Sequence, residues 1–127
     1  MIEYTVRVYN TGEKSWYLNG KLHREDGPAY EFVNGDKYWL LNGRRHRVDG
    51  PACEYTSGAK FWYLNGNLHR EDGPAIEFVD GSKRWFLNGI QFSEEEFLRR
   101  TSPELQVIKD LRVVAEKHGY KLIKEGE

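Results

Sequence analysis

Three histidine–aspartate pairs recur along the chain and are the first candidates for chemistry. In each pair the aspartate follows the histidine by three residues, and the pairs are His23/Asp26, His46/Asp49 and His69/Asp72. Both residue types bind zinc, but a zinc site needs four ligands around one point at about 2.0–2.3 Å. If the pairs lie in successive two-stranded repeats of a sheet, the histidines are about 10 Å apart and cannot share one ion. We therefore expect no metal or other cofactor. Each aspartate should instead accept bonds from its own turn, and each histidine should bond a backbone carbonyl or pack on a tryptophan.

An arginine follows each of these histidines, at Arg24, Arg47 and Arg70. Its nearest acidic neighbours are Asp26 and Glu31 or their equivalents, which predicts a salt bridge within each repeat. Arginines left free would instead form a ladder about 10 Å apart. Such a ladder has the chemistry to grip phosphates or an acidic partner.

The remaining reactive residues do not form a catalytic pattern. No Ser/His/Asp or Cys/His order is present, and Cys53 takes the packing position held by Tyr30 and Ile76 in the other repeats. The glycines suit hairpin turns and do not match the spacing of a phosphate-binding loop. We therefore expect this protein not to be an enzyme.

All these residues belong to a repeat that organises the chain. Tryptophans stand at positions 16, 39, 62 and 85, a constant spacing of 23 residues. The stretches Trp16–Ala29, Trp39–Ala52 and Trp62–Ala75 each read W-x-L-N-G-x-x-H-R-x-D-G-P-A, and a fourth copy stops after Gly89. A fixed period of this length indicates a repeat fold. One short repeat cannot cover its own tryptophan, so neighbouring repeats should stack.

Turn residues divide each repeat into two main strands, represented by Lys37–Leu41 and Ala29–Val33, with a short extended piece such as Leu22–Arg24 between turns. Asn-Gly and similar pairs around the tryptophan strand tolerate the positive φ that tight hairpins require. Residues 3–9 alternate like a strand and would form a half repeat with the first tryptophan strand. The predicted fold is mainly β, a single-layer antiparallel meander of 23-residue hairpin repeats with a C-terminal helical cap.

Side chains of a strand alternate between its two faces. The tryptophans and the leucines two residues later share one face and do not vary between copies, so we expect this face to be the packed one. The other face varies and should be more exposed. Exposed aromatic residues anchor protein interfaces, so this face is the predicted binding surface, with the arginine ladder as its rim. The predicted partner-binding residues are Tyr17, Tyr38, Tyr63, Phe86, Arg24, Arg47 and Arg70.

Helical signals replace the repeat after Gly89. Ser93 followed by Glu96 is a capping box and predicts a helix over about 94–100. Ser102 and Pro103 suit the start of a second helix, and Gly119 suits its end. The apolar residues expected on one face of this helix are Leu105, Ile108, Leu111, Val114 and Ala115. Residues 120–123 would be a last strand or a tail.

The predicted organisation is one domain. Residues 1–92 would form the sheet, with a half repeat, three full copies and a truncated one, and residues 93–127 would cap it. The alternative is that the second helix docks a partner or forms a homodimer.

Composition limits the classes of partner. The chain has 127 residues, enough for one core, and 19 Lys and Arg against 20 Asp and Glu. This balance disfavours nucleic acid, which basic patches bind. Cys53 is the single cysteine, which excludes an internal disulfide and fits a reducing cytoplasm. No apolar run approaches about 18 residues and no signal-peptide pattern is present, so we expect a cytoplasmic protein without a membrane partner.

The repeat resembles the membrane occupation and recognition nexus (MORN) repeat. It is most similar to the variant W-x-L-N-G-x-x-H-R-x-D-G-P-A of large tailed bacteriophages and giant viruses, and the resemblance covers residues 12–92. Lys14, Lys37, Lys60 and Lys83 stand where the usual family has glycine. The family implies a curved, non-catalytic protein-binding sheet.

The resemblance implies a function as well as a fold. We expect a phage-encoded scaffold that binds and inhibits a host protein, such as a defence enzyme, in the host cytoplasm. One alternative is a small-ligand sponge, for instance for nucleotides. The other is a structural or assembly component of a virus.

Overall fold

The computed structural model describes residues 2–121, apart from the side chains of residues 103, 105, 106 and 109. The chain forms two compact units that meet in sequence between Gln91 and Phe92. The first unit is a sheet and the second is helical. That the helices cap the sheet as one domain stays a prediction.

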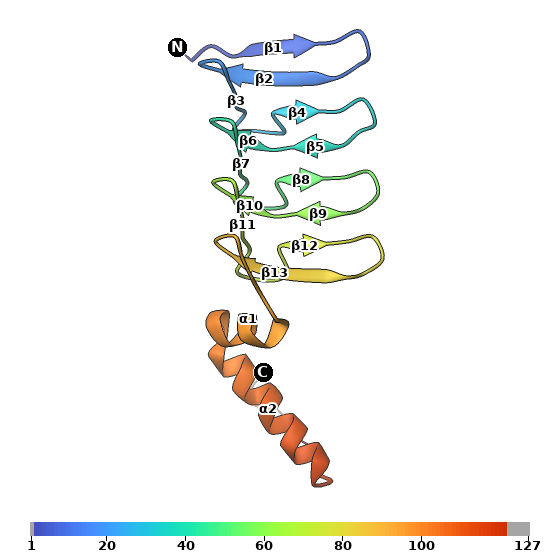
Figure 1. Cartoon of the computed structure of the whole chain (residues 1–127), viewed down its shortest axis with the longest axis vertical. Coiled ribbons are helices and arrows are strands. Elements are labelled where there is room, and N and C mark those ends of the chain that lie inside the picture. The colour runs from blue at the N-terminus through green and yellow to red at the C-terminus, as the bar shows by residue number, and fades with distance from the viewer. Residues whose placement is uncertain (1, 122–127) are drawn as a thin grey trace. The chain divides into compact units, whose positions relative to one another are not determined.

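The sheet unit is a single open layer of antiparallel strands, which confirms the predicted fold class. Figure 1 shows its hairpins following one another in chain order. The strands of the main sheet, in sheet order, are β1 (Thr5–Val8), β2 (Lys14–Leu18), β4 (Tyr30–Glu31), β5 (Lys37–Tyr38), β8 (Cys53–Glu54), β9 (Lys60–Phe61), β12 (Ile76–Glu77), β13 (Lys83–Leu87) and β14 (Ile90–Phe92), with β3 (Lys21–Leu22) paired to β2.

Two small hairpins lie beside the main sheet. They pair β6 (Leu40–Leu41) with β7 (Arg44–Arg45), and β10 (Tyr63–Leu64) with β11 (Asn67–Leu68). The predicted strand Lys37–Leu41 is therefore split at Trp39. The Trp39 N–H donates to the Ala52 carbonyl at 2.7 Å, and the Trp39 carbonyl accepts from the His46 N–H at 3.0 Å. The second half of the strand then pairs with the return of its own Asn-Gly turn.

The turn chemistry follows the sequence. In the Asn-Gly turns both residues have positive φ, for example 51° at Asn42 and 77° at Gly43, which confirms the prediction. The opposite turns enclose three residues. The Phe32 N–H donates to the Asp36 carbonyl at 2.9 Å, and Gly35 has φ 96°.

The first hairpin is a half repeat, as predicted. Its loop bonds, from the Tyr9 N–H to the Glu13 carbonyl and from the Gly12 N–H to the Tyr9 carbonyl, match those made by Phe32 and Gly35. Strand β1 therefore occupies the position of β4, β8 and β12 in the later repeats.

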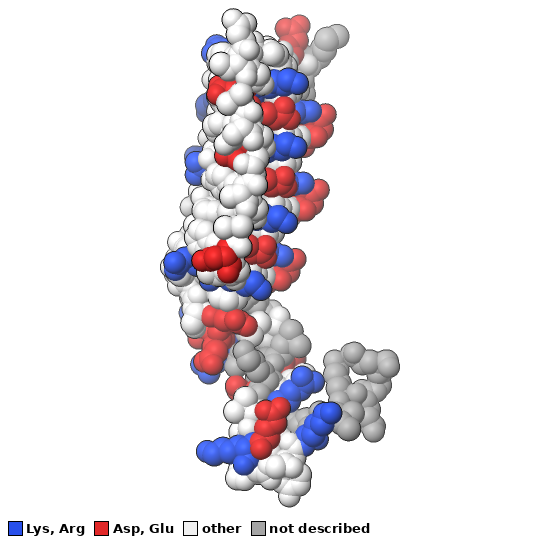
Figure 2. Space-filling model, turned by 90° about the vertical axis from the view of Figure 1, so that its right-hand side faces the viewer, with Lys and Arg blue, Asp and Glu red and all other residues white. Residues whose placement is uncertain are grey.

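The register produces one continuous charge ladder along the main sheet. Cross-strand neighbours alternate in sign in the order Lys14, Glu31, Lys37, Glu54, Lys60, Glu77 and Lys83. Opposite charges facing one another across strands stabilise the pairing. Figure 2 shows basic and acidic side chains alternating along the stack.

The other face carries an aromatic ladder. Neighbouring ring centroids lie 4.4–5.9 Å apart along the series Tyr30, Phe32, Tyr38, Tyr55, Phe61 and Phe78. Edge and tilted contacts at such distances are favourable geometries for aromatic pairs. Each of these contacts joins a ring on a strand to a ring that directly follows the end of a strand.

The Trp/Leu face is packed only in part. Its tryptophans and their partner leucines are half-buried, while Ala29, Ala52 and Ala75, whose carbonyls accept the tryptophan N–H groups, are fully buried. The opposite face is also buried at Ser15 and Leu40, which were predicted to be more exposed, and at Cys53 and Ile76. In a single-layer sheet neither face is covered by a second layer, so burial depends on which side chains are large enough to cover their neighbours.

The helical unit follows its capping signals. Helix α1 (Glu94–Thr101) begins after Ser93, whose Oγ accepts from the Glu96 N–H at 3.2 Å, as predicted. Helix α2 (Pro103–Lys117) begins after Ser102, which makes no side-chain capping bond. Gly119, with φ 84°, ends α2 as predicted, and the Tyr120 N–H donates to the Ala115 carbonyl in the pattern of a Schellman motif.

The predicted apolar face of α2 is partly exposed. Leu111 and Val114 are each 55% exposed, Ile108 and Ala115 are half-buried, and the Leu105 side chain lies outside the described residues. The partner or homodimer role of this helix stays a prediction, as does the strand or tail at 120–123, where Leu122 and Ile123 lie outside the described residues. No helix in residues 2–121 has the length and apolar character needed to cross a membrane.

Candidate functional site

The three repeated arginines lie against both an indole ring and a glycine. The guanidinium carbons of Arg24, Arg47 and Arg70 lie 3.9–4.1 Å from the ring centroids of Trp16, Trp39 and Trp62. Each guanidinium also lies so close to the loop glycine that an added Cβ would meet its carbon at 2.9–3.0 Å. A larger residue in the Asp-Gly-Pro turn would therefore have to displace the arginine.

Hydrogen bonds also hold each arginine against its indole ring and its loop glycine, and we call this arrangement the arginine clamp. These bonds confirm the predicted salt bridges. Arg47 donates through Nε to Asp49 at 3.2 Å, and through Nη1 to the Pro51 carbonyl at 3.1 Å and to Glu54 at 2.9 Å. Arg70 makes the equivalent bonds. Arg24 bonds Asp26 and the Pro28 carbonyl. These guanidiniums are therefore engaged within their own repeats.

The histidines connect one repeat to the next. Nδ1 of His23, His46 and His69 accepts the backbone N–H of Asn42, Asn65 and Asn88, at 2.9–3.0 Å. The expected bond to a backbone carbonyl is wrong, because Nδ1 accepts from a backbone N–H. Packing of the rings on a tryptophan stays a prediction. The expected role of the aspartates also differs, since Asp26 and its equivalents accept from an arginine.

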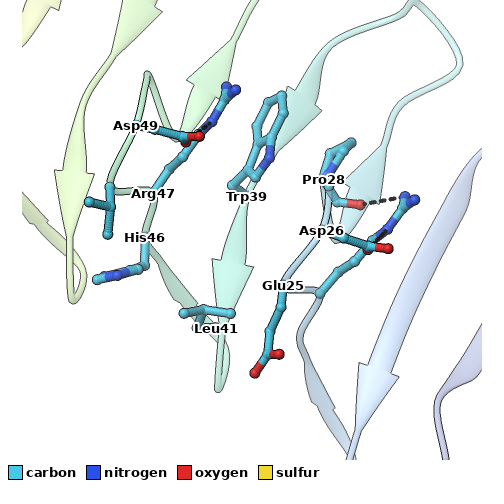
Figure 3. Close-up of a pocket in the computed structure, with 11 residues that line it drawn as sticks. Glu25, Asp26, Pro28, Trp39, Leu41, His46, Arg47 and Asp49 are labelled. Atoms are coloured by element: carbon cyan, nitrogen blue, oxygen red, sulfur yellow. Dashed lines mark hydrogen bonds and ion pairs between the residues drawn. The ribbon is translucent and has the colours of Figure 1, made fainter.

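Two grooves with nearly the same lining lie between successive loops of the Trp/Leu face. Trp39 and Leu41 line the first, together with residues of the loops 24–28 and 46–49, in a volume of about 760 Å³. Trp62 and Leu64 line the second, with the loops 46–51 and 69–72, in about 740 Å³. Figure 3 shows the first groove, where Trp39 lies between Arg47 and Pro28. Each groove is open to solvent.

Carboxylates dominate the exposed rim of these grooves. The Asp26, Asp49 and Asp72 side chains are 85–88% exposed, whereas the arginines they bond are 20–25% exposed. Glu25 and Glu71 are 72% and 78% exposed. The hydrogen bond from Arg70 lowers the pKa of Asp72, so this carboxylate stays ionised. A molecule entering a groove meets acidic groups first and aromatic surface beneath them.

The predicted aromatic residues lie on the opposite face and are half-buried. Tyr38 and Tyr63 flank Arg45, whose guanidinium carbon lies 5.1 and 5.3 Å from their ring centroids. Arg7 lies over Tyr17 in a similar way, at 4.8 Å. Whether these rings contact a partner stays a prediction.

This arrangement corrects the predicted site in one respect. Arg47 stacks on Trp39, while the adjacent Tyr38 faces the other side of the strand. The arginine ladder therefore cannot form the rim of the tyrosine surface, and the two predicted groups lie on separate faces.

The centre of the aromatic face holds a buried thiol and a half-buried phenol. Burial raises the pKa of the Cys53 thiol to about 11, with Arg45 opposing this effect. Burial also raises the pKa of Tyr55, helped by its hydrogen bond to the Tyr38 hydroxyl. An open groove of about 600 Å³ lies nearby, lined by Tyr38, Leu40, Arg44 and Arg45 among others.

The sequence did not predict the groove-lining role of Trp39 and Trp62, the acidic rim or the position of Arg45. The tryptophan present in all four copies and the aspartate present in the three full copies were signals for a shared surface. Arg45 stands where Leu22 and Leu68 occur in the other copies, and this departure from the repeat was a signal for a special role.

Among residues 2–121, no group of three or more His, Cys, Asp or Glu side chains is placed to hold a metal ion. Comparisons of the chain with protein-family models, with curated proteins and with solved structures find no match. What this surface binds is therefore inferred from its own side chains.

Proposed function

We propose that the sheet is a non-enzymatic scaffold that binds another protein. The observation that carries this proposal is the pair of open, equivalent grooves one repeat apart on the Trp/Leu face. Repeated sites on an extended surface suit a ligand that is itself extended, as is common for stacked-repeat proteins. Catalysis would require complementary acid and base groups to converge on one point. Here the charged groups are instead paired within each repeat.

The nucleotide-sponge alternative receives less support. It relied on free arginines to bind phosphate, but Arg24, Arg47 and Arg70 are held by carboxylates, carbonyls and indole rings. The bacteriophage origin, the host location and the inhibition of a defence protein remain part of this proposal through the resemblance to the viral repeat.

Affinity purification of the tagged protein from a bacterial lysate tests the scaffold proposal. Three forms are compared: the wild type, a Trp/Leu-face variant carrying Glu25→Lys and Glu71→Lys, and an aromatic-face variant carrying Tyr63→Ala. We expect one stoichiometric protein partner that the Trp/Leu-face variant no longer retains. If only the Tyr63→Ala form fails to retain the partner, binding would be assigned to the aromatic face, as the sequence predicted. A wild type that retains no protein from the lysate of its own host would contradict the scaffold.

A further inference from the structure

The two grooves form a periodic surface. One repeat contributes two strands to the main sheet, so equivalent points lie about 9.6 Å apart. The lining also repeats, with a tryptophan and a leucine beneath and carboxylates at the rim. A ligand that uses both grooves in the same way must carry equivalent groups at that spacing.

The chemistry of each groove suits a lysine or arginine side chain. Trp39 and Leu41 offer apolar surface for its methylene stem, because long basic side chains bury their stems and leave the charge at the surface. Glu25, Asp26 and Asp49 are exposed at the rim of the same groove, where the charged end of such a side chain would lie. Arg24 and Arg47 are mostly covered and donate to Asp26 and Asp49, so their charges offset those two carboxylates and Glu25 supplies the net negative charge of the groove.

We propose that the Trp/Leu face binds an extended, polyproline-II segment of a protein partner that carries a basic residue at every third position. This inference rests on the proposed scaffold function and names the chemistry of its partner. A polyproline-II helix has three residues per turn and rises about 3.1 Å per residue, which places every third side chain on one side at about 9.3 Å. This distance agrees with the repeat spacing of the sheet. Aromatic-lined grooves are a common way to bind such segments.

Other regular conformations fit less well. Same-side residues of a β-strand are about 6.6 or 13 Å apart, so no pair matches the groove spacing. An α-helix would present every seventh residue at about 10.5 Å. This spacing differs from the groove spacing by about 0.9 Å, against about 0.3 Å for polyproline II, and each groove would meet one side chain from two turns of helix.

The repeats also offer a natural variation in the site. Val48 lines both grooves and is 84% exposed, and it replaces the glutamate found at Glu25 and Glu71. The middle loop therefore lacks one rim carboxylate. Adding it through Val48→Glu should strengthen the binding of a basic segment without changing the buried parts of the repeat.

Fluorescence anisotropy with two labelled peptides of four lysines and eight prolines tests the proposal at about 0.15 M salt, where exposed charges farther apart than about 8 Å are largely screened. One peptide is four copies of Lys-Pro-Pro, and the other has its lysines clustered. Because the two peptides have the same composition, any non-specific attraction between charges should be similar for both. We expect the periodic peptide to bind at least about tenfold more tightly, a difference of about 1.4 kcal/mol.

Variants give the second comparison. Glu25→Lys with Glu71→Lys should abolish binding of the periodic peptide. Val48→Glu should tighten this binding about two- to fivefold, as expected for one exposed ion pair. The charge-matched control, Glu3→Lys with Glu116→Lys, should leave the binding unchanged. Circular dichroism verifies that each variant is folded. Equal affinity for both peptides, or tighter binding of a helical peptide with lysine at every seventh position, would overturn the inference. If the lysate experiment yields a partner that the Trp/Leu-face variant loses, but the periodic peptide does not bind, the scaffold stands and this partner chemistry is rejected.

Discussion

Nδ1 of His23 accepts the backbone N–H of Asn42 at 2.9 Å, across 19 residues of sequence. Because the backbone donates, Nδ1 is the unprotonated nitrogen, and the ring proton is on Nε2, which lies 3.5 Å from Glu25 Oε1. The same bond recurs from His46 to Asn65 and from His69 to Asn88. The histidines therefore act between repeats, where a stacked-repeat protein obtains much of its stability.

Replacing His23 by alanine should lower the free energy of unfolding of the sheet by about 1–3 kcal/mol, because the Asn42 N–H loses its partner. His46→Ala should cost less, since its bond to Asn65 is exposed and water can replace it. Urea unfolding followed by tryptophan fluorescence measures both, because all four tryptophans are in the sheet unit. His118→Ala, at the C-cap of α2, is the control, and equal effects of all three substitutions would contradict the inter-repeat role.

The arginine clamp predicts a strong coupling between Arg70 and Gly73. A Cβ at Gly73 would approach the Arg70 guanidinium carbon to 2.9 Å, and that guanidinium is held in place by Trp62 and its hydrogen bonds. Gly73→Ala should therefore cost about 1–3 kcal/mol of unfolding free energy in the wild type. In an Arg70→Ala background the same change should be neutral or slightly stabilising, because it restricts the unfolded chain. A double-mutant cycle by urea unfolding measures this coupling, and additive effects would refute the clamp.

Glu54 and Glu31 form a matched pair for testing the second salt bridge of the clamp. Glu54 accepts from Arg47 at 2.9 Å, while no bond between Glu31 and Arg24 is present among the described residues. Glu54→Gln should cost about 0.5 kcal/mol more than Glu31→Gln, the size expected for a partly exposed ion pair. The comparison is made by thermal unfolding at low salt, and about 1 M salt should reduce the difference. A larger cost for Glu31→Gln would be inconsistent with the structure.

Cys53 should react slowly with alkylating agents in the folded protein. Burial raises its thiol pKa from about 9.0 to about 11, which lowers the thiolate fraction at pH 8 about 100-fold. Iodoacetamide should therefore modify the folded protein at least about 100-fold more slowly than the urea-unfolded protein, as followed by mass spectrometry. Rapid modification of the folded chain would show that the thiol is accessible.

The raised pKa of the Cys53 thiol also predicts how the free energy of unfolding changes with pH. The neutral thiol is favoured in the folded state, so its contribution is complete below about pH 9 and is lost as pH rises through about 11. The raised pKa of Tyr55 acts in the same direction. Unfolding free energies measured between pH 8 and pH 11 should therefore fall, and Cys53→Ala should fall less steeply. A curve that rises over this range would contradict the burial of both groups.

Local chemistry explains why much of the fold was predictable. Asn42-Gly43 can adopt the positive φ of a tight hairpin, and Ser93 can cap a helix, whatever surrounds them. The half repeat at the N-terminus was predictable for the same reason, since Gly12 stands before its tryptophan as Gly35 does. Such signals act over a few residues and need no knowledge of the tertiary structure.

The candidate site was only partly predictable. The arginine salt bridges join residues within one loop, so their sequence spacing was informative. The grooves were not predictable in this way, because each lies between loops that are a full repeat apart. The middle repeat illustrates this limit, since Arg45 acquires its role only through Tyr38 and Tyr63, which belong to different repeats.

The sequence by itself determined the period of 23 residues, the antiparallel hairpins, the two helices and the pairing of each arginine with its own aspartate. These follow from turn conformations, side-chain alternation and short-range contacts. The tertiary structure decided that both faces are partly buried, that the arginines and tyrosines lie on opposite faces, and that each histidine bonds the next repeat. These depend on distances between residues of different repeats, which are set by the stacking of whole hairpins and are not encoded in any one copy of the motif.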